Sequence, residues 1–191
     1  MRFNSVGDIF DEIDGTRASL LRAVEGLSEE QQRFRPSADR WSVEQLCEHL
    51  AAVEAGVAVL LSKLVGKAEE SESPRAEGSA FEPVSIEEFV ERTRGAKLEA
   101  PERLRPSDST PLSSSLASLA DSRAALHALR PRLERADGHA ARFPHPAWGP
   151  LNLYQWLLFV GAHEGRHLAQ IEALKESMNA APGEGAETAR P

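Results

Sequence analysis

The segment Leu151–Met178 constrains this chain more than any other, because its residue pattern predicts one long amphipathic helix. Apolar residues recur there at steps of three and four, which places them on one face of an α-helix. They are Leu153, Trp156, Leu157, Val160, Leu168, Ile171, Leu174 and Met178. An apolar face of this length is stable when other helices cover it, so the segment favours an all-α bundle.

Two histidines, His163 and His167, lie within this apolar face. Residues four apart on a helix lie one above the other, so both imidazoles can bind the same metal ion. Two core histidines that make ordinary hydrogen bonds are the alternative interpretation. We favour the metal site, because a pair of polar groups that faces the interior of a bundle needs a strong partner.

Three more long helices are predicted before this one. They span Ser5–Leu27, Ser42–Leu64 and Ser115–Ala136. Ser42 and Gln45 have the spacing of a capping box, which marks the start of the second helix. Pro131 is expected to kink the third helix or to divide it in two.

The connection between the second and third helices, Val65–Ser114, is long enough to cross the bundle. Its first part, Gly66–Glu82, is polar, acidic and aperiodic, so we expect a mobile loop. A short helix is predicted from Ser85 to about Arg94, and Ala100–Ser115 is expected to be irregular. A crossover of this length favours an up-down-down-up topology over a simple up-and-down bundle.

The chain is expected to form one domain, residues 1–178, followed by a disordered C-terminal tail, residues 179–191. The stretch between the third and fourth helices, HAARFPHPAWGP at His139–Pro150, contains three prolines and is predicted to be a loop.

The composition narrows the class of protein. A net charge of −8 argues against nucleic-acid binding. No run is predicted to be apolar and long enough to cross a membrane, and the acidic N-terminal stretch lacks the apolar core of a signal sequence. The single cysteine, Cys47, excludes an internal disulfide and is expected to be a small core residue. These features favour a cytoplasmic protein. We further expect a small-molecule substrate as its partner and leave a homodimer open.

A third histidine, His49, is predicted on the inner face of the second helix, between Leu46 and Val53. With His163 and His167 it forms a three-histidine set, which leaves coordination positions for water or substrate, as in catalytic sites. Neutral imidazoles leave the ion its full charge, so a bound water should deprotonate near neutral pH. Zinc, nickel and iron all accept such ligands.

Three stretches resemble the DinB-like superfamily of four-helix metalloproteins. They are RWSVEQLCEHL at Arg40–Leu50, GPLNLYQWL at Gly149–Leu157 and HEGRHLAQIEAL at His163–Leu174. The resemblance implies a DinB-like bundle in which one histidine of the second helix and an HxxxH pair of the last helix bind a divalent metal ion. These histidines correspond to His49, His163 and His167.

The resemblance also implies a class of chemistry. Characterised relatives include enzymes that use mycothiol, bacillithiol or glutathione, so it implies a metalloenzyme of the thiol S-transferase or hydrolase type. The ion would activate a thiol or a water, and a low-molecular-weight thiol is a second candidate cofactor. A non-catalytic protein that holds a metal or a small ligand is the alternative.

Two charged residues are candidates for catalysis. Glu164 completes an HExxH motif, in which zinc peptidases use the glutamate as a base, but no downstream third ligand is well placed here. An exposed helical glutamate is the simpler interpretation of Glu164. Arg123 lies on an apolar stripe and is expected to bind a substrate carboxylate or to form a structural salt bridge. The remaining histidines, His127, His139 and His145, are expected to be exposed.

Overall fold

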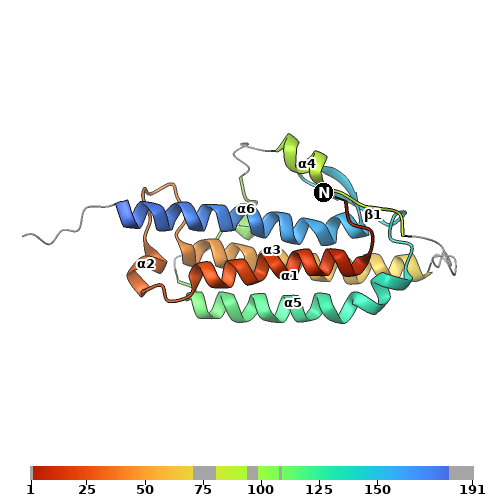
Figure 1. The fold of residues 1–191 in the computed structure, drawn as a ribbon, viewed down its shortest axis with the longest axis horizontal. Helices are drawn as coiled ribbons and strands as arrows, with labels where there is room; N and C mark the ends of the chain where they lie inside the picture. The colour runs from red at the N-terminus through yellow and green to blue at the C-terminus, as the bar shows by residue number, and fades with distance from the viewer. Residues whose placement is uncertain (1, 71–80, 94–98, 108, 181–191) are drawn as a thin grey trace, which may run out of the picture.

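The computed structural model describes residues 2–70, 81–93, 99–107 and 109–180. Within these ranges lie four long helices, which Figure 1 shows side by side: α1 (Val6–Val24), α3 (Val43–Glu70), α5 (Leu112–Arg135) and α6 (Leu153–Ala180). The same ranges contain the shorter α2 (Glu29–Arg33), α4 (Glu87–Arg92) and η1 (Glu102–Leu104), and the strands β1 (Arg142–His145) and β2 (Gly149–Asn152). The predicted all-α four-helix bundle is confirmed.

The direction of the long helices also agrees with the prediction. In Figure 1, α1 and α6 run one way along the bundle, and α3 and α5 run the other way. Helix α3 packs against both α5 and α6, while α1 packs mainly against α6. The topology is therefore up-down-down-up, with parallel neighbours α1/α6 and α3/α5, and the long connection after α3 crosses the bundle. This arrangement makes the helix of His49 a neighbour of the helix of His163 and His167.

Local signals explain where the helices begin. The hydroxyl of Ser5 accepts a hydrogen bond from the backbone N–H of Asp8 (3.0 Å) and caps α1. The predicted capping box at α3 is confirmed, because Ser42 Oγ accepts from Gln45 N (3.3 Å) and Gln45 Oε1 accepts from Ser42 N (3.0 Å). Such caps satisfy backbone donors that a helix cannot satisfy internally.

Some predicted boundaries were wrong. Helix α3 continues past Leu64 to Glu70, and helix α5 begins at Leu112. Of the two outcomes expected at Pro131, a kink or a division, the division does not occur, because α5 continues through Pro131 to Arg135. Residues 71–80 of the expected mobile loop, Arg94 at the expected end of the short helix, and residues 181–191 of the expected tail lie outside the described residues. Asn179 and Ala180, which were assigned to the tail, belong to α6.

The stretch before α6 was predicted as a loop but forms an antiparallel hairpin, β1–β2. Pro144 and Pro150 lie opposite each other, which confines both missing N–H groups to one pair of the ladder. A two-stranded hairpin is marginal alone, and here the indole N–H of Trp156 donates to the carbonyl of Phe143 (3.1 Å) and attaches it to α6. Packing on α6 therefore outweighs the loop signal of the prolines.

The apolar core is divided along the bundle into two clusters, each with residues from all four long helices. One cluster includes Ile13, Val57, Leu126 and Val160. The other includes Leu20, Ala51, Leu119 and Ile171. Between them in sequence, on each helix, stands one buried charged residue: Arg17, Glu54, Arg123 or Glu164. A polar layer therefore separates two apolar halves of the bundle.

Helix α3 requires a correction to the statement about membranes. Its length and hydropathy meet the requirement for a membrane span, and half of the relevant window is buried inside the bundle. An apolar helix of this kind also arises inside a helical bundle, and α3 packs here against α5 and α6.

The join between α5 and the hairpin is held by Tyr154. Its hydroxyl donates to the carbonyl of Ala136 (2.6 Å) and accepts from the N–H of Gly138 (3.2 Å). A Cβ atom at Gly138 would lie 2.7 Å from Leu153 Cδ2 and 2.8 Å from Tyr154 Cζ. The glycine is therefore required by close contact with a ring that cannot move freely.

We predict that Gly138→Ala destabilises the protein by about 1–3 kcal/mol, because the new methyl group overpacks a fixed contact. Gly56→Ala is the matched control, since Gly56 is exposed within α3 and a Cβ there meets nothing within 4 Å. Gly56→Ala should raise the free energy of unfolding by about 0.5–1 kcal/mol, because alanine has the higher helix propensity. Urea unfolding measures both, and equal stability of Gly138→Ala and the wild type would contradict the prediction.

Candidate metal centre

The three predicted histidines meet between α3 and α6. His49 Nε2 lies 3.3 Å from His163 Nε2, and His167 Nε2 lies 3.2 Å from the same atom. His49 and His167 are 5% and 7% exposed, and the candidate ligand atoms of all three lie within 4.8 Å of one another. The expected juxtaposition of one residue of α3 with an i,i+4 pair of α6 is confirmed.

The outer nitrogens of two of these rings determine their tautomers. His49 Nδ1 donates to the carbonyl oxygen of Leu104 (2.7 Å), and His167 Nδ1 donates to Gln170 Oε1 (2.8 Å). A neutral imidazole carries one proton, so both rings direct the lone pair of Nε2 toward His163. Two lone pairs converging on a third imidazole nitrogen need a proton or a cation between them.

A divalent metal ion fits this arrangement. Ligand nitrogens bound at about 2.05 Å in a tetrahedral site lie about 3.3 Å apart, which matches the two separations at His163. Metal-bound histidines usually donate their other N–H to a carbonyl or amide oxygen, as His49 and His167 do here. The residues present therefore fit a metal ion held by three imidazoles.

Burial favours the neutral form of all three rings. It lowers the pKa of His49, an effect that the bond to Leu104 partly opposes. Burial and the neighbouring His167 hold the pKa of His163 well below its usual range. Burial lowers the pKa of His167 to about 4. At neutral pH the site thus presents uncharged ligands without first losing protons.

Aromatic rings and the crossover enclose the site. Trp41, just before α3, packs its ring 5.0 Å from His49 and 6.4 Å from His167. The ring of Phe159 packs 5.2 Å from the ring of His163. The crossover segment is fixed next to His49 by Glu48, which accepts hydrogen bonds from the Ser107 N–H and the Thr110 hydroxyl.

A small cavity adjoins the site between α3 and α6. Its volume is about 10 Å³, and its lining includes His163 and Glu164. The rest of the lining is Leu50, Val53, Glu54, Val57, Phe159 and Val160. This volume is about the minimum that holds one water molecule.

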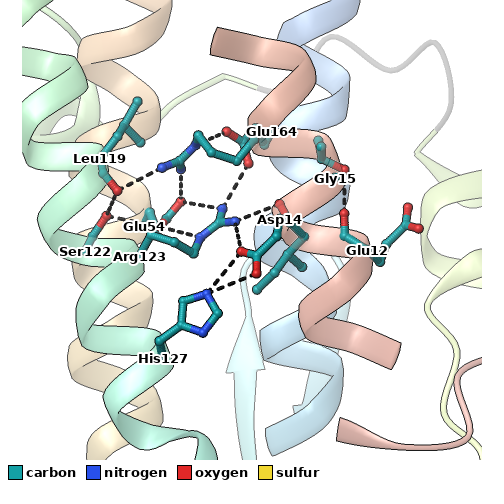
Figure 2. A network of polar contacts seen from close by, with 12 residues as sticks. Glu12, Asp14, Gly15, Glu54, Leu119, Ser122, Arg123, His127 and Glu164 are labelled. Carbon is teal, nitrogen blue, oxygen red and sulfur yellow. Dashed lines mark hydrogen bonds and ion pairs between the residues drawn. The ribbon is translucent and has the colours of Figure 1, made fainter. Parts of the chain in front are cut away.

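Glu164 does not join the histidines. Its side chain is buried, 1% exposed, and accepts hydrogen bonds from Arg17 Nε and from Arg123 Nη2 (3.1 Å). Figure 2 shows it within a polar network that also contains Glu54 and Asp14. The expectation of an exposed glutamate was wrong, because the charge of Glu164 is compensated inside the bundle and needs no solvent.

Arg123 lies at the centre of the same network. Its guanidinium group donates to both carboxylate oxygens of Glu54, to Glu164, to Asp14 and to the carbonyl of Ile13. These contacts occupy all five N–H donors of an arginine, so none remains for a substrate carboxylate. Of the two interpretations given for Arg123, these contacts favour the structural salt bridge.

Sequence reasoning missed Arg17 and Glu54, which belong to the same network. Arg17 donates to Glu54, to Glu164 and to the carbonyl of Leu119 (2.8 Å). The signal that singled out Arg123 was also present at these positions, because Arg17 and Glu54 each interrupt an apolar stripe. We call Arg17, Glu54, Arg123 and Glu164 the buried quartet.

The remaining polar candidates lie apart from the three histidines. His127 is exposed as expected and contacts Asp14. His139 and His145 were expected to be exposed but are half-buried against aromatic rings. Burial raises the pKa of Cys47 to about 12, which agrees with a core residue without nucleophilic character.

Comparison with known families agrees with this geometry. The family model of the DinB superfamily matches residues 12–171. The chain belongs to the DinB superfamily. A similar protein of this length is the uncharacterized protein YuaE of Bacillus subtilis (strain 168), 30% identical over 174 residues that cover 91% of this chain and 99% of YuaE.

Two solved structures share the fold of this DinB-superfamily protein. TT2238, a four-helix bundle protein, matches with a TM-score of 0.57 and 23% identity over 87% of this chain and 98% of TT2238. YfiT from Bacillus subtilis, described as a probable metal-dependent hydrolase with an unusual four-helix bundle topology, matches with a TM-score of 0.59 and 21% identity. That match covers 91% of this chain and 87% of YfiT.

The lowered pKa of His167 predicts how the metal-free protein responds to pH. The folded state holds this ring neutral down to about pH 4, whereas the unfolded chain protonates it near pH 6.5. Its contribution to stability is therefore present above pH 6.5 and is lost as the pH falls toward 4. We expect the wild type to lose about 2 kcal/mol more than His167→Gln between pH 7 and 5.

Urea unfolding in the presence of a chelator measures this difference. Equal pH dependence of the wild type and His167→Gln would show that the ring is not buried as a neutral group.

We predict that Arg123→Met destabilises the protein by about 3–5 kcal/mol, because Glu54 and Glu164 would stay buried with one guanidinium instead of two. Arg132→Met is the control on the same helix, since Arg132 pairs with the partly exposed Glu69. Arg132→Met should lower the free energy of unfolding by less than about 1 kcal/mol. Thermal unfolding compares the two, and similar losses would contradict a special role for the buried pair.

Proposed function

We propose that this DinB-superfamily protein is a metal-dependent enzyme that binds one divalent ion through the Nε2 atoms of His49, His163 and His167. The observation that supports it is the convergence of two Nε2 lone pairs on a third imidazole, at separations of 3.2 and 3.3 Å. Zinc, nickel and iron each accept three imidazoles, so supply in the cell decides among them.

The surrounding residues have defined tasks in this proposal. Leu104 and Gln170 orient the rings of His49 and His167 by accepting their Nδ1 protons. Trp41 packs against both of these rings and limits their movement. A divalent ion held there acts as a Lewis acid and lowers the pKa of a water or a thiol that it binds.

Activation of water, as in a hydrolase, is the reaction class that we favour. The cavity next to His163 has room for about one water molecule. The similar fold of YfiT, described as a probable metal-dependent hydrolase, supports the same class. Thiol S-transfer is the second candidate and rests on the family resemblance. We expect a cytoplasmic enzyme with a small-molecule substrate.

The zinc peptidase interpretation gains no support from the geometry. A catalytic glutamate of an HExxH motif must reach the substrate at the metal. Glu164 instead accepts hydrogen bonds from Arg17 and Arg123, and its carboxylate lies within the buried quartet.

The proposal predicts one bound divalent ion per chain, with His49→Ala weakening zinc affinity at least tenfold through the loss of a ligand. Competition with a chromophoric chelator measures the affinity, and metal analysis gives the stoichiometry. His127→Ala is the control, because His127 is exposed and contacts Asp14 instead of the site. Unchanged zinc binding in both His49→Ala and His163→Ala would exclude the site.

Turnover is tested separately with 4-nitrophenyl acetate and with a panel of thiols and electrophiles. Hydrolysis that disappears with a chelator and returns with added metal supports the hydrolase. Thiol conjugation with the same metal dependence supports the transferase. Tight metal binding without either activity favours the non-catalytic binding protein.

A further inference from the structure

The outer nitrogen of His163 differs from those of the other two histidines. The Nδ1 atoms of His49 and His167 each donate to an oxygen atom of the protein. In the described part of the chain, Nδ1 of His163 has no such partner, and only its Nε2 has neighbours at hydrogen-bond distance. If Nε2 of His163 binds the ion, the neutral ring carries its proton on Nδ1. That N–H needs an acceptor, as the outer N–H of a metal-bound histidine usually has one.

The small cavity between α3 and α6 adjoins this ring. Its lining includes the side chains of Glu54, His163 and Glu164, and the other lining residues are apolar. His49 and His167, which contact Nε2 of His163, do not line the cavity. The cavity therefore adjoins a part of the ring away from Nε2, and the polar atom of that part is Nδ1.

Volume and lining together favour one water molecule in this cavity. The volume of about 10 Å³ is close to that needed by one water. Cavities that stay dry are apolar, whereas a buried water makes roughly two to four hydrogen bonds to polar groups. The lining supplies such groups, because an imidazole N–H is a donor and the two carboxylates are acceptors. A water there can accept a hydrogen bond from His163 and donate one to a carboxylate.

The existing hydrogen bonds distinguish the two carboxylates, both of which appear in Figure 2. Four donor atoms of Arg17, Ser122 and Arg123 lie at hydrogen-bond distance from Glu54, two at each of its oxygens. Glu164 has one donor at each oxygen, Arg17 Nε at Oε1 and Arg123 Nη2 at Oε2. A carboxylate oxygen accepts about two hydrogen bonds. The donors around Glu54 match its capacity, and Glu164 retains one acceptor site at each oxygen.

We infer that Glu164 is a positioning residue for His163, joined to it by one water molecule in the cavity. The Nδ1–H of His163 donates to this water, and the water donates to the carboxylate of Glu164. The inference rests on the proposed metal site, and the water that the ion would activate is a second molecule. The bridge gives His163 the oxygen acceptor that His49 and His167 already have, which fixes the orientation of its ring.

The bridge also connects the buried quartet to the metal centre. Arg17 and Arg123 hold the carboxylate of Glu164, and the carboxylate in turn holds the water at His163. A carboxylate behind a metal-bound imidazole raises the basicity of the ligand nitrogen, and its loss usually costs about tenfold or more in metal affinity.

The first test needs no variant. Crystal structures of the metal-free and the zinc-loaded wild type should both show one water within about 3.2 Å of His163 Nδ1 and of a Glu164 oxygen. An empty cavity, or a water that bonds to Glu54 and not to His163, overturns the inference.

The second test compares Glu164→Gln with Glu54→Gln. Each variant removes one negative charge from the same quartet and the same cavity, so the long-range effect on the ion is matched. An amide has one oxygen, for which two arginines compete in Glu164→Gln, and the water loses its acceptor. In competition with a chromophoric chelator, Glu164→Gln should bind zinc about tenfold more weakly than Glu54→Gln.

A spectroscopic measurement separates positioning from a general loss of structure. In nitrogen-15 NMR of the zinc-loaded protein, the Nδ1 proton of His163 should exchange with solvent about tenfold faster in Glu164→Gln than in Glu54→Gln. The Nδ1 protons of His49 and His167 should exchange alike in both variants, because their acceptors are unchanged. If either variant fails to fold, the wild-type crystal structures still decide the question.

The outcomes distinguish this inference from the proposed function. A wild type that binds no zinc overturns both, since His163 then has no ion to be oriented toward. Normal zinc binding with an empty cavity overturns the role of Glu164 alone. Equal zinc affinity and equal exchange of the His163 proton in the two variants overturn it as well.

Discussion

The buried quartet is the interaction on which the rest of this bundle depends. Each long helix contributes one member, and the two arginines and two glutamates balance in charge between two apolar clusters. Buried charges are stable only with their partners in place, and these partners are 37 to 147 residues apart in the chain. The charges are therefore compensated only when all four helices have assembled in one register, which makes folding cooperative.

The same register places the histidines. On α6, Glu164 turns toward α1 and α5, whereas His163 and His167 turn toward α3 (Figure 2 for Glu164). Because neighbouring residues of a helix are rotated by about 100°, adjacent residues of one turn can face different neighbouring helices. The quartet fixes the rotation of α6, and that rotation brings Nε2 of His163 to the lone pairs of His49 and His167. The HExxH motif here combines the proposed metal-binding pair with a glutamate that accepts hydrogen bonds from two buried arginines.

Periodicity and capping signals predicted the helices and the faces of His49, His163 and His167, since these depend on local spacing. The partners of the charges were not predictable in this way. Arg17 and Glu54 interrupt apolar stripes, but which carboxylate meets which guanidinium depends on helix rotation, which spacing alone does not reveal. The hairpin was missed because its prolines indicate a loop, while its stability comes from Trp156 on α6. His145 was expected to be exposed for the same reason, but packing of the hairpin on α6 half-buries it.

The crossover has a kinetic consequence. The carbonyl that orients His49 belongs to Leu104, in a segment held by hydrogen bonds of Glu48 to Ser107 and Thr110 near the surface. Few buried apolar contacts oppose the detachment of such a segment, so it opens at a free-energy cost well below that of global unfolding. Each opening releases the outer nitrogen of His49. An ion in the proposed site would therefore be bound less tightly by His49 during each opening, while the bundle itself stays folded.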